Sequence, residues 1–175
     1  MIGKWKKLSE KVLYDNPWLK VREDAVVKPD GTKGTYTVGQ LRSGISIIPV
    51  DELGKIWMVK HYRYIFDDIH WELVAGDIEQ GENSQAAAER ELFEELGLTA
   101  ANWRNIGKFR PSNGSVDQVC DIWLAKGLEV AKTPTDEFDI LARHTFTLGE
   151  IDQMIKNGEI VDGYVMNALY FYKLL

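Results

Sequence analysis

The sequence has little of several features that mark particular classes of protein. Its single cysteine, Cys120, excludes an internal disulfide and is consistent with a reducing cytoplasm. No apolar run approaches the roughly 18 residues of a membrane span, and the basic N-terminus lacks the apolar segment of a signal peptide. Acidic residues outnumber basic ones, 27 to 21, which leaves no excess of positive charge for nucleic acid. We therefore expect a cytoplasmic protein without nucleic-acid or membrane partners.

The length of 175 residues and the hydrophobic fraction of 45% predict one globular domain, or one domain with a small appended element. The first 40 residues read as strands and turns, with Pro29-Asp30-Gly31 as a turn. The strands are predicted at Val12–Tyr14, Leu19–Val27 and Thr35–Val38. We interpret residues 1–40 as an N-terminal β-element and residues 41–175 as the main domain.

The main domain mixes strand patterns with three helical patterns. The helices are predicted at Ser84–Leu96, Thr147–Asn157 and Asp162–Leu175. Gly44–Val50 and Lys55–Tyr62 predict a hairpin around the turn at 51–54. Further strands are predicted at Trp71–Ala75, Ile106–Phe109 and Gln118–Ala125. This mixture indicates an α+β fold, arranged as an α/β/α sandwich.

The segment Ser84–Leu96 has the strongest helical pattern. It contains no glycine or proline and is rich in residues that favour helices. Ser84 is the expected N-cap, and Gly97 suits the left-handed residue that follows a last helical turn. A spacing of four residues predicts one buried stripe, formed by Ala88, Leu92 and Leu96.

Three carboxylates crowd the C-terminal half of this helix, at Glu91, Glu94 and Glu95. Like charges at these spacings repel, and the C-terminal end of a helix dipole is already negative. A bound divalent cation would relieve both effects, whereas a solvated acidic face is the alternative interpretation.

Gly76 to Leu98 read GDIEQGENSQAAAERELFEELGL, with glycines, glutamates and an arginine at fixed spacings. This segment resembles the Nudix box at all nine constrained positions, for which a chance match at one start point is roughly 10⁻⁹ to 10⁻¹⁰. The resemblance implies the Nudix fold, a mixed β-sheet between helices, with residues 1–40 as an additional β-element. It also implies a hydrolase of nucleoside diphosphates linked to another group.

The resemblance to the Nudix box implies a role for each of its charged residues. It implies Mg²⁺ as the cofactor, with Mn²⁺ as an alternative, and two or three bound ions. Glu94 is then either a further metal ligand beside Glu91 and Glu95 or a base that orients water. Glu95 also belongs to the implied catalytic residues. The implied metal ligands are Glu91, Glu94, Glu95 and the backbone carbonyl of Ala75. Glu82 and Arg90 are expected to form an ion pair that fixes the loop to the helix.

The segment before the box resembles the YR…WELPAG run of pyrophosphatases that act on ADP-ribose and related nucleoside diphosphate sugars. Here it comprises Tyr62-Arg63 and Trp71-Glu72-Leu73-Val74-Ala75-Gly76, with Val74 in place of the usual proline. Arg63 is then expected to contact phosphate, because a guanidinium matches phosphate geometry. Glu72 is expected to contact substrate or metal.

Two later segments resemble functional loops of the same subfamily. Asn113 falls where an SPG marker has its proline, so it is expected near substrate, although Asn113-Gly114 is also a turn signal. A broader sugar range, including GDP-mannose and ADP-glucose, therefore stays open. The acidic loop 133–139 is expected to supply a general base. Glu137 is the first choice, Asp139 the second and Asp136 the third.

The N-terminal element carries Trp5, Tyr14, Trp18 and Tyr36. In the resembled subfamily this region packs against a second subunit and contacts the base, so a homodimer is expected, with Trp18 as the stacking residue.

The resemblance as a whole predicts Mg²⁺-dependent hydrolysis of nucleoside diphosphate sugars to a nucleoside monophosphate and a sugar phosphate. Other Nudix substrates remain open, namely nucleoside triphosphates, diadenosine polyphosphates and coenzyme A. A non-catalytic ligand-binding regulator is the alternative of a different class, but such proteins usually lose box carboxylates. Cys120 lies in an apolar strand pattern and does not suit a catalytic cysteine of an isopentenyl diphosphate isomerase.

Overall fold

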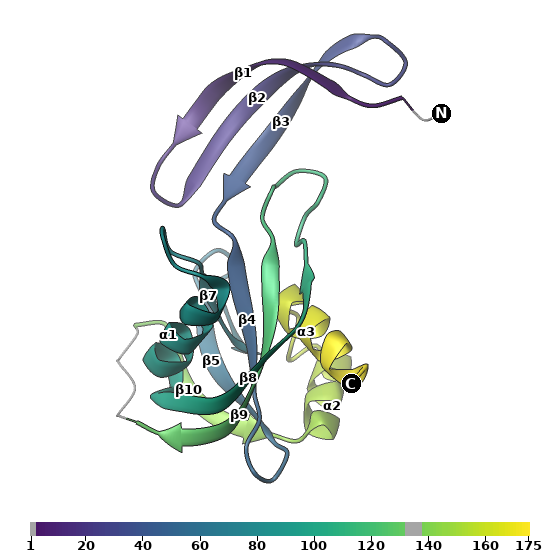
Figure 1. Ribbon diagram of the computed structural model, residues 1–175. Helices are drawn as coiled ribbons and strands as arrows, with labels where there is room; N and C mark the ends of the chain where they lie inside the picture. The colour runs from purple at the N-terminus through teal and green to yellow at the C-terminus, as the bar shows by residue number, and fades with distance from the viewer. Residues whose placement is uncertain (1–2, 132–137) are drawn as a thin grey trace. The chain divides into compact units, whose positions relative to one another are not determined.

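The computed structural model describes residues 3–131 and 138–175 and divides into two compact units (Figure 1). The N-terminal unit comprises residues 1–43 together with 110–119. The main unit comprises residues 44–109 and 120–175. Among the described residues, no helix has both the length and the apolar character needed to cross a membrane.

The N-terminal unit is an antiparallel sheet of three strands in the order β1-β2-β3. Its strands are β1 (Lys6–Asp15), β2 (Leu19–Val27) and β3 (Lys33–Leu41). The turn between β2 and β3 forms because Gly31 takes a φ of 86° and the Asp30 carboxylate accepts a hydrogen bond from the Thr32 N–H. Strand β1 lies at the edge of the sheet and all its residues are exposed.

The segment 110–119 belongs to the same compact unit as this sheet. The Gly39 N–H donates to the Ser115 carbonyl, and the Asp117 N–H donates to the Gly39 carbonyl. A Cβ on Gly39 would lie 2.8 Å from a methyl group of Val116, so glycine permits this close approach. Tyr36 also donates its hydroxyl hydrogen to the Gly114 carbonyl. The N-terminal unit therefore includes a segment, 110–119, that is distant from the three strands in the sequence.

The main unit contains two sheets, and the larger one is mixed. Its strands follow the order β7-β4-β9-β8, in which β4 and β9 are parallel and the other pairs antiparallel. They are β4 (Gly44–Pro49), β7 (Val74–Asp77), β8 (Leu98–Phe109) and β9 (Cys120–Val130). The smaller sheet is antiparallel, in the order β10-β5-β6. It consists of β5 (Ile56–Arg63), β6 (Asp68–Glu72) and β10 (Ile140–Phe146).

In the described residues of the main unit, three helices cover the sheets: α1 (Ser84–Leu96), α2 (Leu148–Asn157) and α3 (Gly163–Lys173). Figure 1 shows α1 and α3 on opposite faces of the mixed sheet, and both helices contact β4 and β8. The expected fold class, a mixed sheet between helices with an added N-terminal β-element, is confirmed. Thr147 caps α2 in a reciprocal capping box, and Asp162 caps α3.

The predicted helix Ser84–Leu96 is confirmed, but its predicted N-cap is wrong. The cap is Asn83, whose side-chain oxygen accepts a hydrogen bond from the Ala86 N–H at 2.9 Å. The Ser84 hydroxyl instead accepts a hydrogen bond from the Trp123 indole at 2.8 Å. Gly97 has the left-handed conformation expected of it, with a φ of 67°. The predicted stripe of Ala88, Leu92 and Leu96 is buried.

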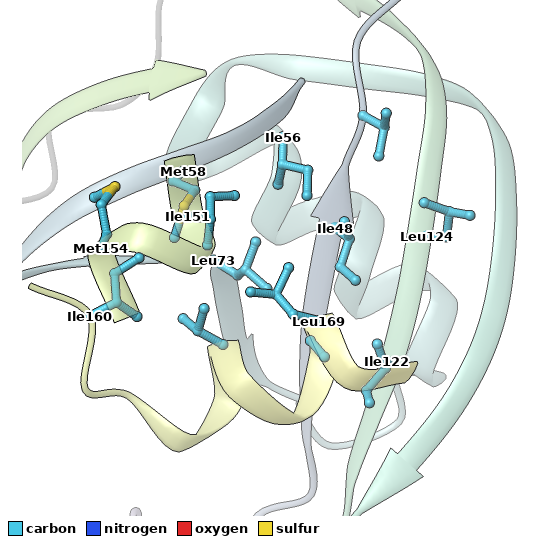
Figure 2. Close-up of a cluster of buried hydrophobic side chains, with 13 residues drawn as sticks. Ile48, Ile56, Met58, Leu73, Ile122, Leu124, Ile151, Met154, Ile160 and Leu169 are labelled. Atoms are coloured by element: carbon cyan, nitrogen blue, oxygen red, sulfur yellow. The ribbon is translucent and has the colours of Figure 1, made fainter. Parts of the chain in front are cut away.

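The core of the main unit has two parts, one on each side of the mixed sheet. The part under α2 and α3 is drawn in Figure 2, and it combines Ile151 and Leu169 of the helices with Ile48 of β4 and Ile122 of β9. The other part lies under α1 and contains its buried stripe. Because strand β4 contributes to both parts, each of its residues is buried.

The predicted hairpin of Gly44–Val50 with Lys55–Tyr62 is wrong. Strand β4 pairs with β7 and β9, whereas β5 pairs with β6 and β10 in the other sheet. Only an isolated bridge between Val50 and Ile56 joins the two segments. The sequence also did not predict β10, and Trp71–Ala75 is divided between β6 and β7. Apolar runs indicate buried strands but do not specify their partners.

Candidate functional site

The main unit packs helix α1 against strand β7, and a side chain of α1 lies very close to Gly76 of β7. A Cβ at Gly76 would lie 2.0 Å from a carboxylate oxygen of Glu91 and 2.2 Å from its carboxyl carbon. Any other residue at this position would therefore displace the Glu91 side chain. Ala75 precedes Gly76 on β7 and pairs with Ser46 of β4. The Glu91 carboxylate is thus held over the strand that carries the Ala75 carbonyl.

Arg90 is the centre of the charge network around α1. Its guanidinium donates to both carboxylate oxygens of Glu82, at 3.1 and 3.2 Å, and to the Asp77 carbonyl at 2.9 Å. It also donates to Glu91 at 2.7 Å and to Glu94 at 3.1 Å. The hydrogen bond from Arg90 lowers the pKa of Glu82 and, reciprocally, raises that of Arg90. Arg90 therefore ties the loop, β7 and two α1 carboxylates together.

The three α1 carboxylates lie in different environments. The side chain of Glu94 is 40% exposed, that of Glu91 is largely covered, and Glu95 as a whole is only 2% exposed. Arg143 of β10 donates its Nε–H to the backbone carbonyl of Glu95 and so fixes the end of the helix. Glu95 is thus the most buried of the three carboxylates, and Asp and Glu are rarely buried unless they are paired or bind a metal.

The donor chemistry of this region fits a hard divalent cation. Adjacent elements offer carboxylate and carbonyl oxygens. Because Gly76 of β7 has no side chain, the Glu91 carboxylate can approach the strand. In the described part of the chain, no three acidic, histidine or cysteine side chains form a preassembled metal cluster. Two of the α1 carboxylates, Glu91 and Glu94, pair with the Arg90 guanidinium.

A second ion pair lies on the smaller sheet. Arg63 of β5 donates through Nε and Nη2 to the two carboxylate oxygens of Glu72 on β6, at 2.9 and 2.5 Å. Burial by itself would raise the pKa of Glu72, but the neighbouring side chains of Arg63 and His61 outweigh it and lower the pKa to about 2. Glu72 is therefore ionised throughout the neutral range, and its pairing orients the guanidinium.

Arg63 borders two hollows of the main unit. The larger has a volume of about 550 Å³ and is also lined by Glu72, Asp68 and His70 of β6 and by Asp162 at the start of α3. Burial raises the pKa of Asp162, whose carboxylate caps α3 through the Val165 N–H. The smaller hollow, of about 310 Å³, includes Asp139. The volume of the larger one suits a nucleoside or a sugar.

The remaining predicted residues lie elsewhere in the structure. Trp18 and Asn113 belong to the N-terminal unit, where Trp18 is 69% exposed between β1 and β2. Asn113 lines a hollow of about 350 Å³ beside Tyr36. Glu137 lies outside the described residues, as does Asp136, while Asp139 precedes β10 and its carbonyl accepts from the Tyr62 N–H.

The sequence did not identify His61 and Asp162 as neighbours of the ion pair between Arg63 and Glu72. His61 lies two residues before Arg63, and alternation along a strand puts both side chains on one face. That signal was present in the sequence. Asp162 was expected only as the first residue of a predicted helix, and its proximity to Arg63 and Glu72 depends on how α3 folds back on the sheet.

The low pKa of Glu72 predicts a pH-dependent contribution to stability. Ionised Glu72 is favoured in the folded chain, so its contribution is fully present above pH 4.5 and is lost as the pH falls toward 2. We expect Glu72→Gln to lower the free energy of unfolding on the order of 3 kcal/mol at pH 7, with a difference that shrinks below pH 4.5. Urea unfolding between pH 3 and 7 measures this difference. Glu129→Gln, at an exposed position of β9, is the control, and a difference independent of pH would contradict the assignment.

Comparison with known proteins gives consistent matches over both units. Residues 40–169 match the NUDIX domain, and residues 5–38 match the nucleoside diphosphate sugar hydrolase N-terminal domain. The chain is 26% identical to an ADP-ribose pyrophosphatase of Bacillus subtilis (strain 168), over 97% of this chain and 92% of that protein. It is 30% identical to an ADP-ribose pyrophosphatase of Mycobacterium tuberculosis, over 89% of this chain and 76% of that protein.

A solved structure described as an ADP compounds hydrolase has the same fold. Its TM-score is 0.86 at 18% identity, covering 99% of this chain and 94% of that one. Three findings agree: the box from Gly76 through α1, the fold, and the two domain matches. The chain is therefore a member of the Nudix family with a nucleoside diphosphate sugar hydrolase N-terminal domain.

Proposed function

We propose that this Nudix hydrolase cleaves the pyrophosphate bond of nucleoside diphosphate sugars, giving a nucleoside monophosphate and a sugar phosphate. The observation that carries the proposal is the Glu91 carboxylate seated on Gly76, with Glu94 and Glu95 on the same helix. The N-terminal domain match and the two relatives named ADP-ribose pyrophosphatase support this substrate class. ADP-ribose would yield AMP and ribose 5-phosphate.

Nudix hydrolases generally use divalent metal ions, and we propose two or three Mg²⁺ ions here, with Mn²⁺ as a substitute. Glu91, Glu94, Glu95 and the carbonyl of Ala75 would hold them. Bound there, such ions would neutralise charge on the diphosphate and make a bound water easier to deprotonate. Arg90 and Glu82 would keep the loop and helix aligned behind these ligands, because their ion pair also anchors the Asp77 carbonyl.

Arg63 would bind the diphosphate with the edge of its guanidinium that Glu72 leaves available. Glu72 accepts from Nε and Nη2, so the Nη1 edge can donate to phosphate oxygens. The larger hollow beside this pair would receive the sugar or nucleoside portion. Its carboxylates at Asp68, Glu72 and Asp162 accept hydrogen bonds, which suits hydroxyl groups better than it suits phosphate.

The loop 133–139 would supply the general base that takes a proton from the attacking water. Glu137 remains the first candidate, and Asp139 is supported by its position in the hollow that Arg63 also lines.

We further propose that Trp18 stacks on the nucleoside base and that Asn113 contacts substrate. A homodimer is supported by the exposed apolar residues of β1, which lies at the edge of its sheet. The buried, single cysteine is consistent with a cytoplasmic location.

The reaction class is tested by turnover with Mg²⁺ on ADP-ribose, ADP-glucose, GDP-mannose, UDP-glucose, a nucleoside triphosphate and a diadenosine polyphosphate. Mass spectrometry of the products should show a nucleoside monophosphate and a sugar phosphate from one or more diphosphate sugars. Turnover of the triphosphate or the dinucleotide alone would move the assignment to another Nudix substrate. Binding without any turnover would support a non-catalytic regulator.

The metal-ligand assignment predicts a large difference between two neighbouring glutamates of α1. We expect Glu91→Gln to lower kcat by about 100-fold or more, because one ligand is lost, with a higher Mg²⁺ requirement. Glu89→Gln should leave kcat nearly unchanged, since Glu89 is exposed and contacts Gln85 on the outer face. Kinetics as a function of Mg²⁺ concentration measure both effects. Equal activity of the two variants would exclude Glu91 as a ligand.

The assignment of the general base is tested in the loop 133–139. Glu137→Gln should lower kcat by about 100-fold and remove the acidic limb of the pH–rate profile, while Asp139→Asn has a smaller effect. The pH dependence of kcat for both variants makes the comparison. A silent Glu137→Gln together with an impaired Asp139→Asn would transfer the role to Asp139.

A further inference from the structure

His61 is the most unusual polar residue in the interior of the main unit. It is only 4% exposed, and within the described part of the chain neither of its ring nitrogens has a hydrogen-bond partner. A buried polar group without a partner destabilises the folded state by roughly 1–3 kcal/mol. Strand neighbours such as Val59 are apolar, so an apolar side chain would fit the packing at this position without that loss. The histidine therefore calls for a functional explanation.

The nearest charged atom to the imidazole is the carboxylate of Glu72. The distance from His61 Nδ1 to Glu72 Oε2 is 3.6 Å, slightly longer than a hydrogen bond. The pairing register of β5 with β6 puts Val59 opposite Glu72 and His61 opposite His70. Side chains at alternate positions share a face, so His61, Arg63 and Glu72 lie on the same side of this sheet. A small rotation of the carboxylate would close the contact.

Glu72 has one strong partner and one near partner. Arg63 binds both carboxylate oxygens, but its own side chain is 41% exposed and comes from the end of β5. An ion pair with a half-exposed arginine holds a carboxylate less firmly than a buried donor does, because the long side chain retains rotamer freedom. The buried imidazole is the only other basic side chain within 4.0 Å of the Glu72 carboxylate in the described part of the chain.

We propose that His61 is a positioning residue for the diphosphate-binding arginine. In the substrate complex its Nδ1–H donates to Glu72 Oε2, which locks the Glu72 carboxylate and, through it, the plane of the Arg63 guanidinium. The Nη1 edge of Arg63 then meets the diphosphate without first losing rotational freedom. This inference rests on the proposed function, since it assigns Arg63 to the diphosphate. His61 itself does not touch the substrate.

The test is a double-mutant cycle on the full chain with Mg²⁺ and the best diphosphate sugar substrate. The variants are His61→Phe, Glu72→Gln and the double variant, with His61→Asn as the conservative replacement, because its amide N–H takes the place of the Nδ1–H. We expect His61→Phe to raise KM about 10-fold with kcat changed less than about 3-fold. His61→Asn should recover most of the loss. In the Glu72→Gln background, His61→Phe should have no further effect, because the residue acts through Glu72.

Thermal unfolding separates positioning from packing. We expect His61→Phe to melt at the same temperature as the unmodified chain or higher, because it removes two buried nitrogens without partners. His144→Phe is the matched control, since His144 is exposed on β10 and packs against Trp71 and Phe146. Its KM should not change.

Two results would overturn the proposal while leaving the function intact. One is an unchanged KM in His61→Phe, and the other is an effect of His61→Phe that persists undiminished in the Glu72→Gln background. If His61→Phe lowers stability and activity together, the cycle still decides, because an indirect packing effect adds to that of Glu72→Gln. Absence of turnover on every diphosphate sugar by the unmodified chain would instead reject the proposed function, and this inference with it.

Discussion

The arrangement of the candidate site depends on the guanidinium of Arg90. Three carboxylates at the C-terminal half of α1 repel one another and the helix dipole, so the helix needs a positive charge nearby. Arg90 provides it from within the same helix, through contacts with Glu91 and Glu94. Its other contacts, to Glu82 and the Asp77 carbonyl, connect the helix to the loop and to β7. The Arg90 side chain therefore both reduces the repulsion among the α1 carboxylates and positions the site.

The close packing of α1 on β7 is the second requirement, and it explains the first glycine of the box. Without a side chain at Gly76, the Glu91 carboxylate reaches the strand backbone. The same strand begins two residues after Glu72, whose pairing with Arg63 forms the other charged part of the unit. Ala75 follows Glu72 by three residues in the sequence, so their Cα atoms lie at most about 10 Å apart. One proposed metal ligand, the Ala75 carbonyl, and the carboxylate that pairs with the proposed phosphate contact thus lie on consecutive strands, β7 and β6.

Features that depend on residue type and spacing were predicted from the sequence. Features that depend on contacts between distant segments were not. The α1 helix, its buried stripe through Leu92 and the left-handed Gly97 follow from spacing and residue type, and the structure has them. Asn83 and Ser84 are both good N-caps, and the contact of Ser84 with Trp123 is a tertiary feature that sequence does not show. The pairing of β4 with β9 and the attachment of 110–119 to β3 likewise join distant segments. His61 had a readable signal, its alternation with Arg63, whereas its lack of a hydrogen-bond partner appears only in three dimensions.

The most direct test of the central claim is a crystal structure of the full chain with Mn²⁺ and a diphosphate sugar analogue whose bridging oxygen is replaced by a methylene group. Anomalous scattering locates manganese independently of any assumption about its ligands. We expect manganese peaks bounded by the carboxylates of Glu91 and Glu95 and the carbonyl of Ala75, with the diphosphonate reaching Arg63. Manganese bound away from α1, or a diphosphonate that contacts neither the metal nor Arg63, would contradict it.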